Sequence, residues 1–156
     1  MDNSWKRKSK AHSDKYKKLL DNKRTLSRIK ELPEIHDKVF FEVDCLDCAA
    51  CCKNHSPTFK ATDVRRISKF LNISEREFEL QYLKVDEEND MVLKSSPCNF
   101  LNQDNTCQIY EVRPLDCARY PYTDEDIFLK HRTLTLSNAK VCPAVHKVLE
   151  HLLSIG

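Results

Sequence analysis

Eight cysteines carry the clearest chemical potential in this sequence, and half of them fall in one stretch of eight residues. That stretch, CLDCAACC, runs from residue 45 to residue 52. Two residues between successive cysteines let a chain turn around a metal ion and direct both sulfur atoms inward. We therefore take all eight as candidate metal ligands: Cys45, Cys48, Cys51, Cys52, Cys98, Cys107, Cys117 and Cys142.

Other roles of clustered cysteines fit this sequence less well. A disulfide framework is rare in the cytosol, where we expect this chain, and the adjacent Cys51 and Cys52 could join only through a strained ring. Single cysteines often pack as small apolar residues, but packing does not explain two C-x2-C spacings in tandem. A thioredoxin-like pair would need a βαβ context that the sequence lacks. Metal binding is the favoured interpretation.

The spacing leaves the number and geometry of metal centres open. Continued to Cys51, the run reads C-x2-C-x2-C, which places three thiolates around one centre, as in iron–sulfur loops. If the segment is helical instead, Cys45, Cys48 and Cys52 share a face, and Cys51 is turned away by about a hundred degrees. Eight thiolates are also twice the four that one tetrahedral or cubane site needs, so one or two centres remain possible.

The same cysteine spacing indicates which metal is bound. We favour an iron–sulfur cluster, because three close cysteines followed by a remote Cys142-Pro143 pair resemble the ferredoxin arrangement. The chain has no second run of this kind to support a two-cluster ferredoxin. Zn2+ is the alternative, because tetrahedral thiolate sites are common and would stabilise a modest core.

Few other side chains compete for a chemical role. His55 follows the cluster by three residues and could replace a thiolate, but we interpret it as a solvated loop histidine because the sulfurs already exceed one site's demand. Arg113 and Arg119 flank Cys117. They either donate hydrogen bonds to metal-bound sulfur or an anionic substrate, or form a structural pair with Asp116 or Asp124. No Ser/His/Asp arrangement can be argued, so we name no catalytic residue.

Composition limits the remaining functions. The chain has 156 residues, of which 40% are hydrophobic and 32% charged, as expected for one globular domain. No apolar run is long enough to span a membrane, and the N-terminus lacks the apolar region of a secretory signal, so we expect a cytoplasmic protein. The only glycine is Gly156. Phosphate-binding loops, dinucleotide-binding turns and nucleophile elbows all need glycine, so nucleotide enzymes and serine hydrolases are disfavoured.

Charge is divided unevenly along the chain. Residues 1–30 hold eleven Lys and Arg against three Asp, a net charge of +8, and because the whole chain is +2 the remainder carries −6. We interpret the basic segment as a solvated helical arm rather than a nucleic-acid-binding tail, since it lacks an aromatic stacking pattern. We expect its Trp5 to be exposed and residues 1–35 to be dispensable for folding. We expect a monomer with no membrane or nucleic-acid partner, and leave a protein partner open.

The elements that must position these cysteines are read from periodicity and capping signals. We predict helices over 14–31, ending before Pro33, over 62–72 with Thr62 as N-cap, over 74–84 from a Ser74/Glu77 capping box, and over 143–155. We predict strands or extended segments over 38–43, 91–94 and 127–136, and a hairpin over 98–110.

The predicted fold is a small α+β single metal-binding domain with short helices, a hairpin and an irregular cysteine-rich centre. Residues 1–35 are assigned to a basic helical N-terminal arm that precedes the domain, and residues 36–156 to the cysteine-cluster domain. No internal repeat or low-complexity linker interrupts this arrangement.

The separated motifs together resemble the CxxCxxCC family of zinc- or iron-chelating proteins, also called YkgJ-like cysteine-cluster proteins. The resemblance covers about residues 43–145 and joins CLDCAACC, CNFL, CQIY, RPLDCARYP and a final Cys-Pro in order. The family often has glycine after the second cysteine, where this chain has Ala49, and arginine after the third motif's cysteine, where it has Ala118.

The resemblance implies a bound metal, while the family's biological role is unestablished. Two further functions stay open beside a metal-binding module of this kind. One is an iron–sulfur oxidoreductase or protein-modification enzyme acting with a partner, since a similar module looks to be present in a flagellin lysine methylase. The other is a metal carrier or metal-responsive interaction protein that uses the surplus thiols as a labile site.

Overall fold

The computed structural model describes residues 4–156 and divides the chain into two compact units. One unit combines the chain up to Cys45 with residues 121–156, and the other is the intervening segment Leu46–Tyr120. The sequence predicted different boundaries, an arm over residues 1–35 followed by a domain over 36–156. The difference arises because apolar side chains of the N-terminal helices pack together with the C-terminal helix.

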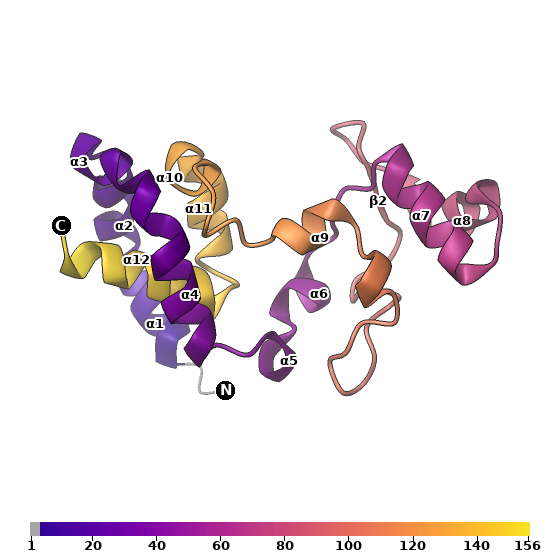
Figure 1. Cartoon of the computed structure of the whole chain (residues 1–156), viewed down its shortest axis with the longest axis horizontal. Coiled ribbons are helices and arrows are strands. Elements are labelled where there is room, and N and C mark those ends of the chain that lie inside the picture. The colour runs from indigo at the N-terminus through magenta and orange to yellow at the C-terminus, as the bar shows by residue number, and fades with distance from the viewer. Residues whose placement is uncertain (1–3) are drawn as a thin grey trace. The chain divides into compact units, whose positions relative to one another are not determined.

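The first unit is helical throughout its regular structure in the described residues (Figure 1). Its N-terminal part contains α1 (Ser4–Ala11), α2 (Ser13–Leu20), α3 (Lys23–Leu26), the 3-10 helix η1 (Ser27–Glu31) and α4 (Leu32–Glu42). Its C-terminal part contains α10 (Ile127–Lys130), α11 (Arg132–Asn138) and α12 (Pro143–Ser154).

Helix α12 forms the centre of this unit and contacts α1, α2 and α4. Val145, Val148, Leu149 and Leu152 are at most 1% exposed, and their spacing of three and four residues makes one apolar face. Pro143 lies in the first turn, where its missing N–H costs nothing. The predicted C-terminal helix is confirmed.

The N-terminal helices supply the other side of the same core. Tyr16, Leu19, Leu20, Leu32 and Ile35 are all buried in it. The thin apolar stripe seen in the sequence is therefore a packed face. Trp5, expected to be exposed, is half-buried, and its ring centroid lies 6.0 Å from that of His146.

Three predicted elements of this unit are wrong. The helix expected over 14–31 is broken into α2, α3 and η1, and Pro33 begins α4 instead of stopping a helix. The segment 38–43, rich in strand-forming residues, is mainly the end of α4, because Ile35 and Val39 bury one helical face. The segment 127–136, expected to be extended, forms α10 and much of α11, with Phe128 in the core.

The second unit combines short helices with a small sheet. Its elements are α5 (Cys45–Cys48, beginning at the unit boundary), α6 (Ala50–Asn54), α7 (Ala61–Leu71), α8 (Glu75–Tyr82), β1 (Leu83–Val85), β2 (Met91–Leu93), the 3-10 helix η2 (Tyr110–Val112) and α9 (Leu115–Arg119). β1 and β2 pair antiparallel, with Leu83 opposite Leu93 and Val85 opposite Met91.

A second core holds this unit together. Its buried members are Phe59, Val64, Ile67, Phe78, Leu83, Leu93, Phe100 and Ile109. Cys98 and Cys107 pack against this cluster. These two candidate ligands are thus attached to an apolar core rather than to a free loop.

Local sequence signals predict some elements of this unit correctly and others incorrectly. The Ser74/Glu77 capping box is confirmed, with both reciprocal hydrogen bonds present. Thr62 is wrong as N-cap of α7, because the helix begins at Ala61 and Lys60, two residues before Thr62, occupies the cap. The strand at 91–94 is confirmed as β2. The hairpin over 98–110 is reduced to one antiparallel bridge, between Leu101 and Cys107.

The structure is mostly helical with a small two-stranded antiparallel sheet, which is consistent with a small α+β protein. Among residues 4–156, none of the helices combines the length and the apolar composition needed to cross a bilayer.

Candidate metal centre

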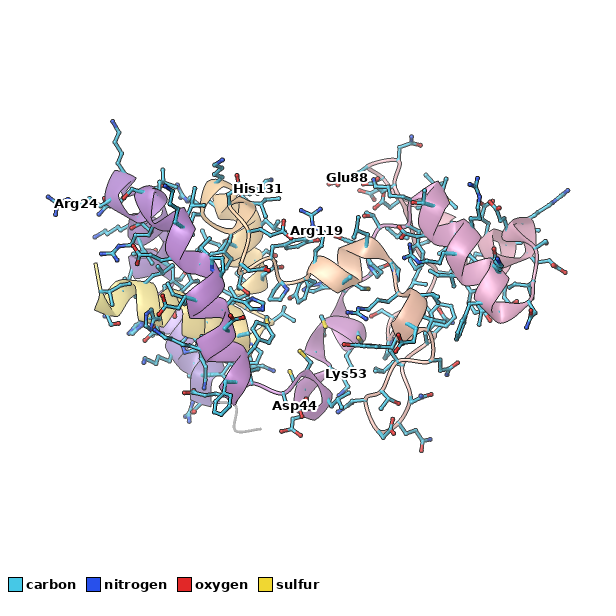
Figure 2. The ribbon with its side chains drawn as sticks, viewed as in Figure 1. Arg24, Asp44, Lys53, Glu88, Arg119 and His131 are labelled. Carbon is cyan, nitrogen blue, oxygen red and sulfur yellow. The ribbon has the colours of Figure 1, made fainter. Side chains whose placement is uncertain are left out.

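The CLDCAACC stretch forms two short helices separated by Ala49. Cys45 and Cys48 bound α5, while Cys51 and Cys52 lie in α6. Ala49 adopts a left-handed conformation, with φ of 45° and ψ of 25°, which breaks the helix and redirects the chain. Neither a continuous helix nor an open loop describes the segment. Yellow sulfur atoms are drawn around α5 and α6, where Lys53 is labelled (Figure 2).

The adjacent cysteines of α6 interact directly. Their sulfur atoms lie 4.0 Å apart. The hydrogen bond from the Cys52 thiol lowers the pKa of Cys51 to about 7, and the same contact, together with burial, raises the pKa of Cys52. A pKa near 7 keeps much of Cys51 as thiolate at neutral pH, which is the form that binds metals.

The segment that contains Cys98 and Cys107 is joined to this helix. The backbone N–H of Cys98 donates to the carbonyl of Cys52 at 2.8 Å. At the tip of the loop, the Asn105 side chain donates to the carbonyl of Leu46 at 2.6 Å. Burial raises the pKa of the Cys98 thiol, and the negative charge of Cys107 adds to that effect.

Cys117 comes from α9, the last helix of this unit. Burial, together with the negative charges of Cys98 and Cys51, raises the pKa of its thiol to about 12. The next residue back, Asp116, accepts hydrogen bonds from the backbone N–H of Thr58 at 3.0 Å and from its hydroxyl at 3.4 Å. α9 is therefore fixed to the chain that follows α6.

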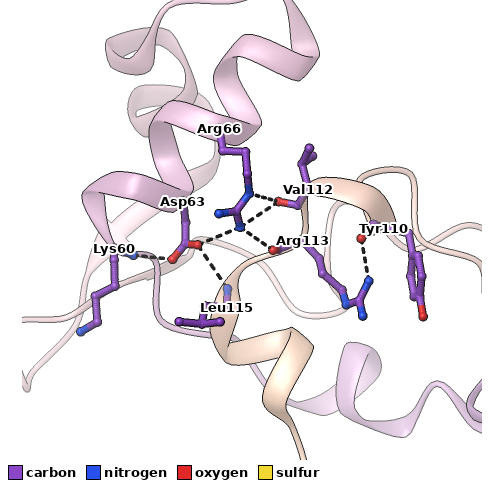
Figure 3. Close-up of polar contacts among 7 residues, drawn as sticks. All are labelled: Lys60, Asp63, Arg66, Tyr110, Val112, Arg113 and Leu115. Atoms are coloured by element: carbon purple, nitrogen blue, oxygen red, sulfur yellow. Dashed lines mark hydrogen bonds and ion pairs between the residues drawn. The ribbon is translucent and has the colours of Figure 1, made fainter.

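A buried carboxylate holds the start of α9 in place (Figure 3). Asp63 is 1% exposed and accepts hydrogen bonds from Lys60 N–H at 3.0 Å, from the Arg66 guanidinium at 3.0 Å and from Leu115 N–H at 3.2 Å. Arg66 also donates to the carbonyl of Arg113 at 2.7 Å. Sequence reasoning missed Asp63, although its position three residues after the cap of α7 is a signal for a capping carboxylate.

The arginines near Cys117 have structural contacts. The Arg113 guanidinium donates to the carbonyl of Tyr110 at 2.8 Å and stacks on the Tyr110 ring at 3.9 Å. Asp116, its suggested partner, bonds Thr58 as described. Arg119 is exposed. Arg113 thus supports the turn before α9 through a cation–π contact.

The remaining three cysteines are on α5 and at the start of α12. Cys45 is exposed and Cys48 is half-buried at the two ends of α5. Cys142 is half-buried at the N-cap of α12, packed against the core of the first unit. Neighbouring thiols shift the pKa of Cys51, Cys52, Cys98 and Cys117, and Cys107 is one of the neighbours that raise the pKa of Cys98 and Cys117.

His55 differs from its sequence interpretation. It is half-buried, its Nε2 atom is covered, and that atom has no hydrogen-bond partner among the described residues. Its backbone N–H donates to the carbonyl of Cys51 at 2.8 Å, and its ring centroid lies 6.2 Å from that of Tyr120. An isolated loop histidine would instead have both ring nitrogens in water.

The donor atoms of these residues are of the types that bind metals, but their side chains are not yet close enough to one another to hold an ion. No group of three or more Cys, His, Asp and Glu side chains within residues 4–156 is arranged to hold an ion. The thiols are nevertheless close enough for their charges to interact, and a covered imidazole nitrogen ends α6. Sulfur and imidazole donors suit zinc and iron. Metal binding at this site requires the side chains to close in.

Comparison with known proteins gives an independent indication. A model of the CxxCxxCC family, described as a "putative zinc- or iron-chelating domain", matches residues 44–143, a range that includes all eight cysteines. An uncharacterized protein of Methanocaldococcus jannaschii is 31% identical over 96 residues, which cover 60% of this chain and 50% of that protein. This chain therefore spans about half of that relative's length. No solved structure gives a significant match.

Proposed function

This chain belongs to the CxxCxxCC family, and we propose that it binds its metal through thiolates gathered from α6, the 98–107 loop and α9. The residues that would hold the metal are drawn from Cys51, Cys52, Cys98, Cys107 and Cys117. The observation that carries the proposal is that four of these thiols, Cys51, Cys52, Cys98 and Cys117, have a pKa shifted by others of the five. They come from segments as much as 66 residues apart in the chain, yet they share one electrostatic environment.

Ionising clustered thiols is unfavourable in the metal-free protein. Several half-buried thiols that repel one another as thiolates resist ionisation, as the raised pKa of Cys117 indicates. A bound cation reverses this balance, because it stabilises each thiolate that it contacts. Binding a metal therefore releases protons and ties together segments that otherwise only lie near each other.

We propose an iron–sulfur cluster as the native occupant. The C-x2-C-x2-C spacing that ends at Cys51 favours it over a mononuclear site and makes Cys48, in the same run, a further candidate ligand. Zinc is the alternative and would take the same thiolates readily in protein handled in air. When bound, a cluster supplies electron transfer, whereas zinc supplies structural stability; in either case the chain's thiolates orient the centre and the second core anchors two of them.

The test is purification without oxygen, followed by metal and sulfide analysis and an absorption spectrum. We expect a brown protein that contains iron and sulfide and whose broad visible absorption bleaches on reduction. A colourless protein with stoichiometric zinc and no sulfide would contradict the cluster while keeping the metal site. Protein that retains neither metal, even after reconstitution, would contradict metal binding itself.

Single substitutions test whether the cysteines of residues 98–117 contribute to metal binding. Cys98→Ser, Cys107→Ser and Cys117→Ser should each weaken metal binding by about tenfold or more, since each removes a thiolate donor. Ala118→Ser is the matched control, because it places a hydroxyl beside Cys117 at an exposed position. Metal binding left intact by all three cysteine variants would show that the site lies elsewhere.

A metal carrier is the second candidate, and the exposed thiol of Cys45 favours it. A carrier gives up its metal quickly to a competing chelator, whereas a structural centre releases metal only when the domain unfolds. Chelator exchange compared with the unfolding rate separates the two. Exchange much faster than unfolding supports the carrier.

A further inference from the structure

We propose that His55 is a ligand of the bound metal through its Nε2 atom, an inference that rests on the metal binding proposed above. The sequence favoured a solvated loop histidine at this position. The structure covers Nε2 and leaves it without a hydrogen-bond partner among the described residues. A buried polar atom without a partner costs about 1–3 kcal/mol, and such atoms in native proteins usually mark an ion or water that binds them.

The position of the imidazole links it to the cysteine-bearing helices. The His55 N–H bonds the carbonyl of Cys51 at 2.8 Å, so His55 lies one helical turn beyond that ligand candidate. Its ring centroid lies 6.2 Å from that of Tyr120, the residue at the end of α9, which is the helix that carries Cys117. His55 therefore lies where α6 and α9 end, and both helices contribute thiols to the proposed site.

A metal satisfies this atom better than a buried water does. An ordered internal water typically makes about three hydrogen bonds, and His55 offers it one. A metal that already holds thiolates needs only the lone pair of Nε2. Zinc accepts combined cysteine and histidine ligands, and histidine also replaces cysteine in some iron–sulfur centres.

Charge gives a second reason for a nitrogen ligand. Four thiolates around a divalent ion leave a net charge of −2, whereas three thiolates and a neutral imidazole leave −1. The smaller charge is less costly to keep in a half-buried site. With His55 as one of four ligands, a single ion would need only three of the five interacting thiols.

The experiment compares the full-length wild type with His55→Phe, using Co2+ as the probe under reducing, oxygen-free conditions. Phenylalanine keeps an aromatic ring and removes the unpaired nitrogen, so the apoprotein should remain at least as stable as the wild type in urea. Co2+ affinity should nevertheless fall about tenfold or more. The visible Co2+ absorption bands should also shift, because one nitrogen donor is lost. His151→Phe, a half-buried histidine of α12, is the control and should change neither quantity.

Each outcome is decisive. Wild-type protein that binds no Co2+ would contradict the proposed function and this inference together. Wild-type protein that binds Co2+, with identical affinity and spectrum in His55→Phe, would contradict only the role of His55.

If His55→Phe does not fold, the wild type itself supplies the test. Nitrogen NMR of the histidine side chains with and without Zn2+ should show Nε2 of His55 changing to a metal-bound signal. An unchanged His55 signal in Zn2+-loaded protein would overturn the inference.

Discussion

Ala49 has a backbone conformation that its side chain does not favour. Its φ of 45° lies in the left-handed region, which costs a residue with a Cβ atom roughly 1–2 kcal/mol. The cost is tolerated because this turn separates α5 from α6 and so sets the directions of the two cysteine pairs. Glycine, which has no Cβ atom, adopts the same conformation freely.

Ala49→Gly should stabilise the protein by about 0.5–1 kcal/mol, because the relief of strain exceeds the extra chain entropy of glycine. Urea unfolding of the metal-free protein measures the change. Ala50→Gly is the matched control and should destabilise by a similar amount, since Ala50 begins a helix. Equal destabilisation by both substitutions would show that the left-handed turn carries no strain.

At the scale of elements, the start of α9 depends on one carboxylate. Asp63 caps α7 and, at the same time, accepts the Leu115 N–H and orients Arg66 toward the 112–113 carbonyls. One side chain thus connects two helices that are distant in sequence. Cys117 follows this junction by two residues, so the carboxylate fixes the backbone that carries a candidate ligand.

Asp63→Ala should destabilise the second unit by about 2–4 kcal/mol, because it leaves buried N–H groups and the Arg66 charge without their acceptor. Unfolding followed by circular dichroism measures the loss. Glu75→Ala, which removes an exposed carboxylate 3.5 Å from Arg65, should change stability by less than about 1 kcal/mol. Comparable losses in both variants would contradict the role assigned to Asp63.

A second polar junction joins α1 and α2 to α12. The Glu150 carboxylate contacts Lys8 at 2.6 Å, His12 Nδ1 at 2.6 Å and the Tyr16 hydroxyl at 2.8 Å. Burial alone would raise the pKa of Glu150, but these hydrogen bonds outweigh it and lower the pKa to about 2. The folded state thus prefers the ionised carboxylate.

The consequence is a specific acid sensitivity. Because the folded pKa lies below the ordinary value of 4.5, the stabilisation is complete above pH 4.5 and is lost as the pH falls towards 2. Unfolding followed by the emission of Trp5 should show this loss in the wild type and a shallower one in Glu150→Gln. Glu34→Gln, which alters an exposed pair with Lys38, should follow the wild type. Identical acid profiles for all three proteins would contradict the assignment.

At the scale of the whole molecule, the chain is two units with separate cores, one of them completed by both ends of the chain. The basic N-terminal residues are part of a core and not an appendage. Their charges lie on the outer faces of α1 and α2, while Tyr16, Leu19 and Leu20 are buried. The first unit therefore needs its N-terminal helices.

Deleting residues 1–20 should unfold the first unit, because it removes buried side chains that cannot be replaced from elsewhere. Loss of helical circular dichroism measures this effect. The control replaces Lys15, Lys17 and Lys18 with glutamine, which removes charge and keeps the core; it should leave the fold intact. A truncated protein with the same helicity per residue as the wild type would show that these residues are dispensable for folding.

The parts of this protein that were predictable from sequence depend on neighbours in the chain. The Ser74/Glu77 capping box and the helix that begins at Pro143 are local patterns, and both are present. Cysteine spacing likewise indicated metal chemistry, because a ligand motif needs particular residue types at short intervals. The family match over residues 44–143 agrees with that indication.

Tertiary contacts decided the rest, because burial depends on partners far away in sequence. Residues 38–43 are mostly helical despite their strand-forming side chains, since α4 gains more by packing against α12. The ring nitrogen of His55 is covered, and no local pattern in the sequence signals this. The sequence by itself determined which atoms could bind a metal, and only the folded chain decided which of them come together.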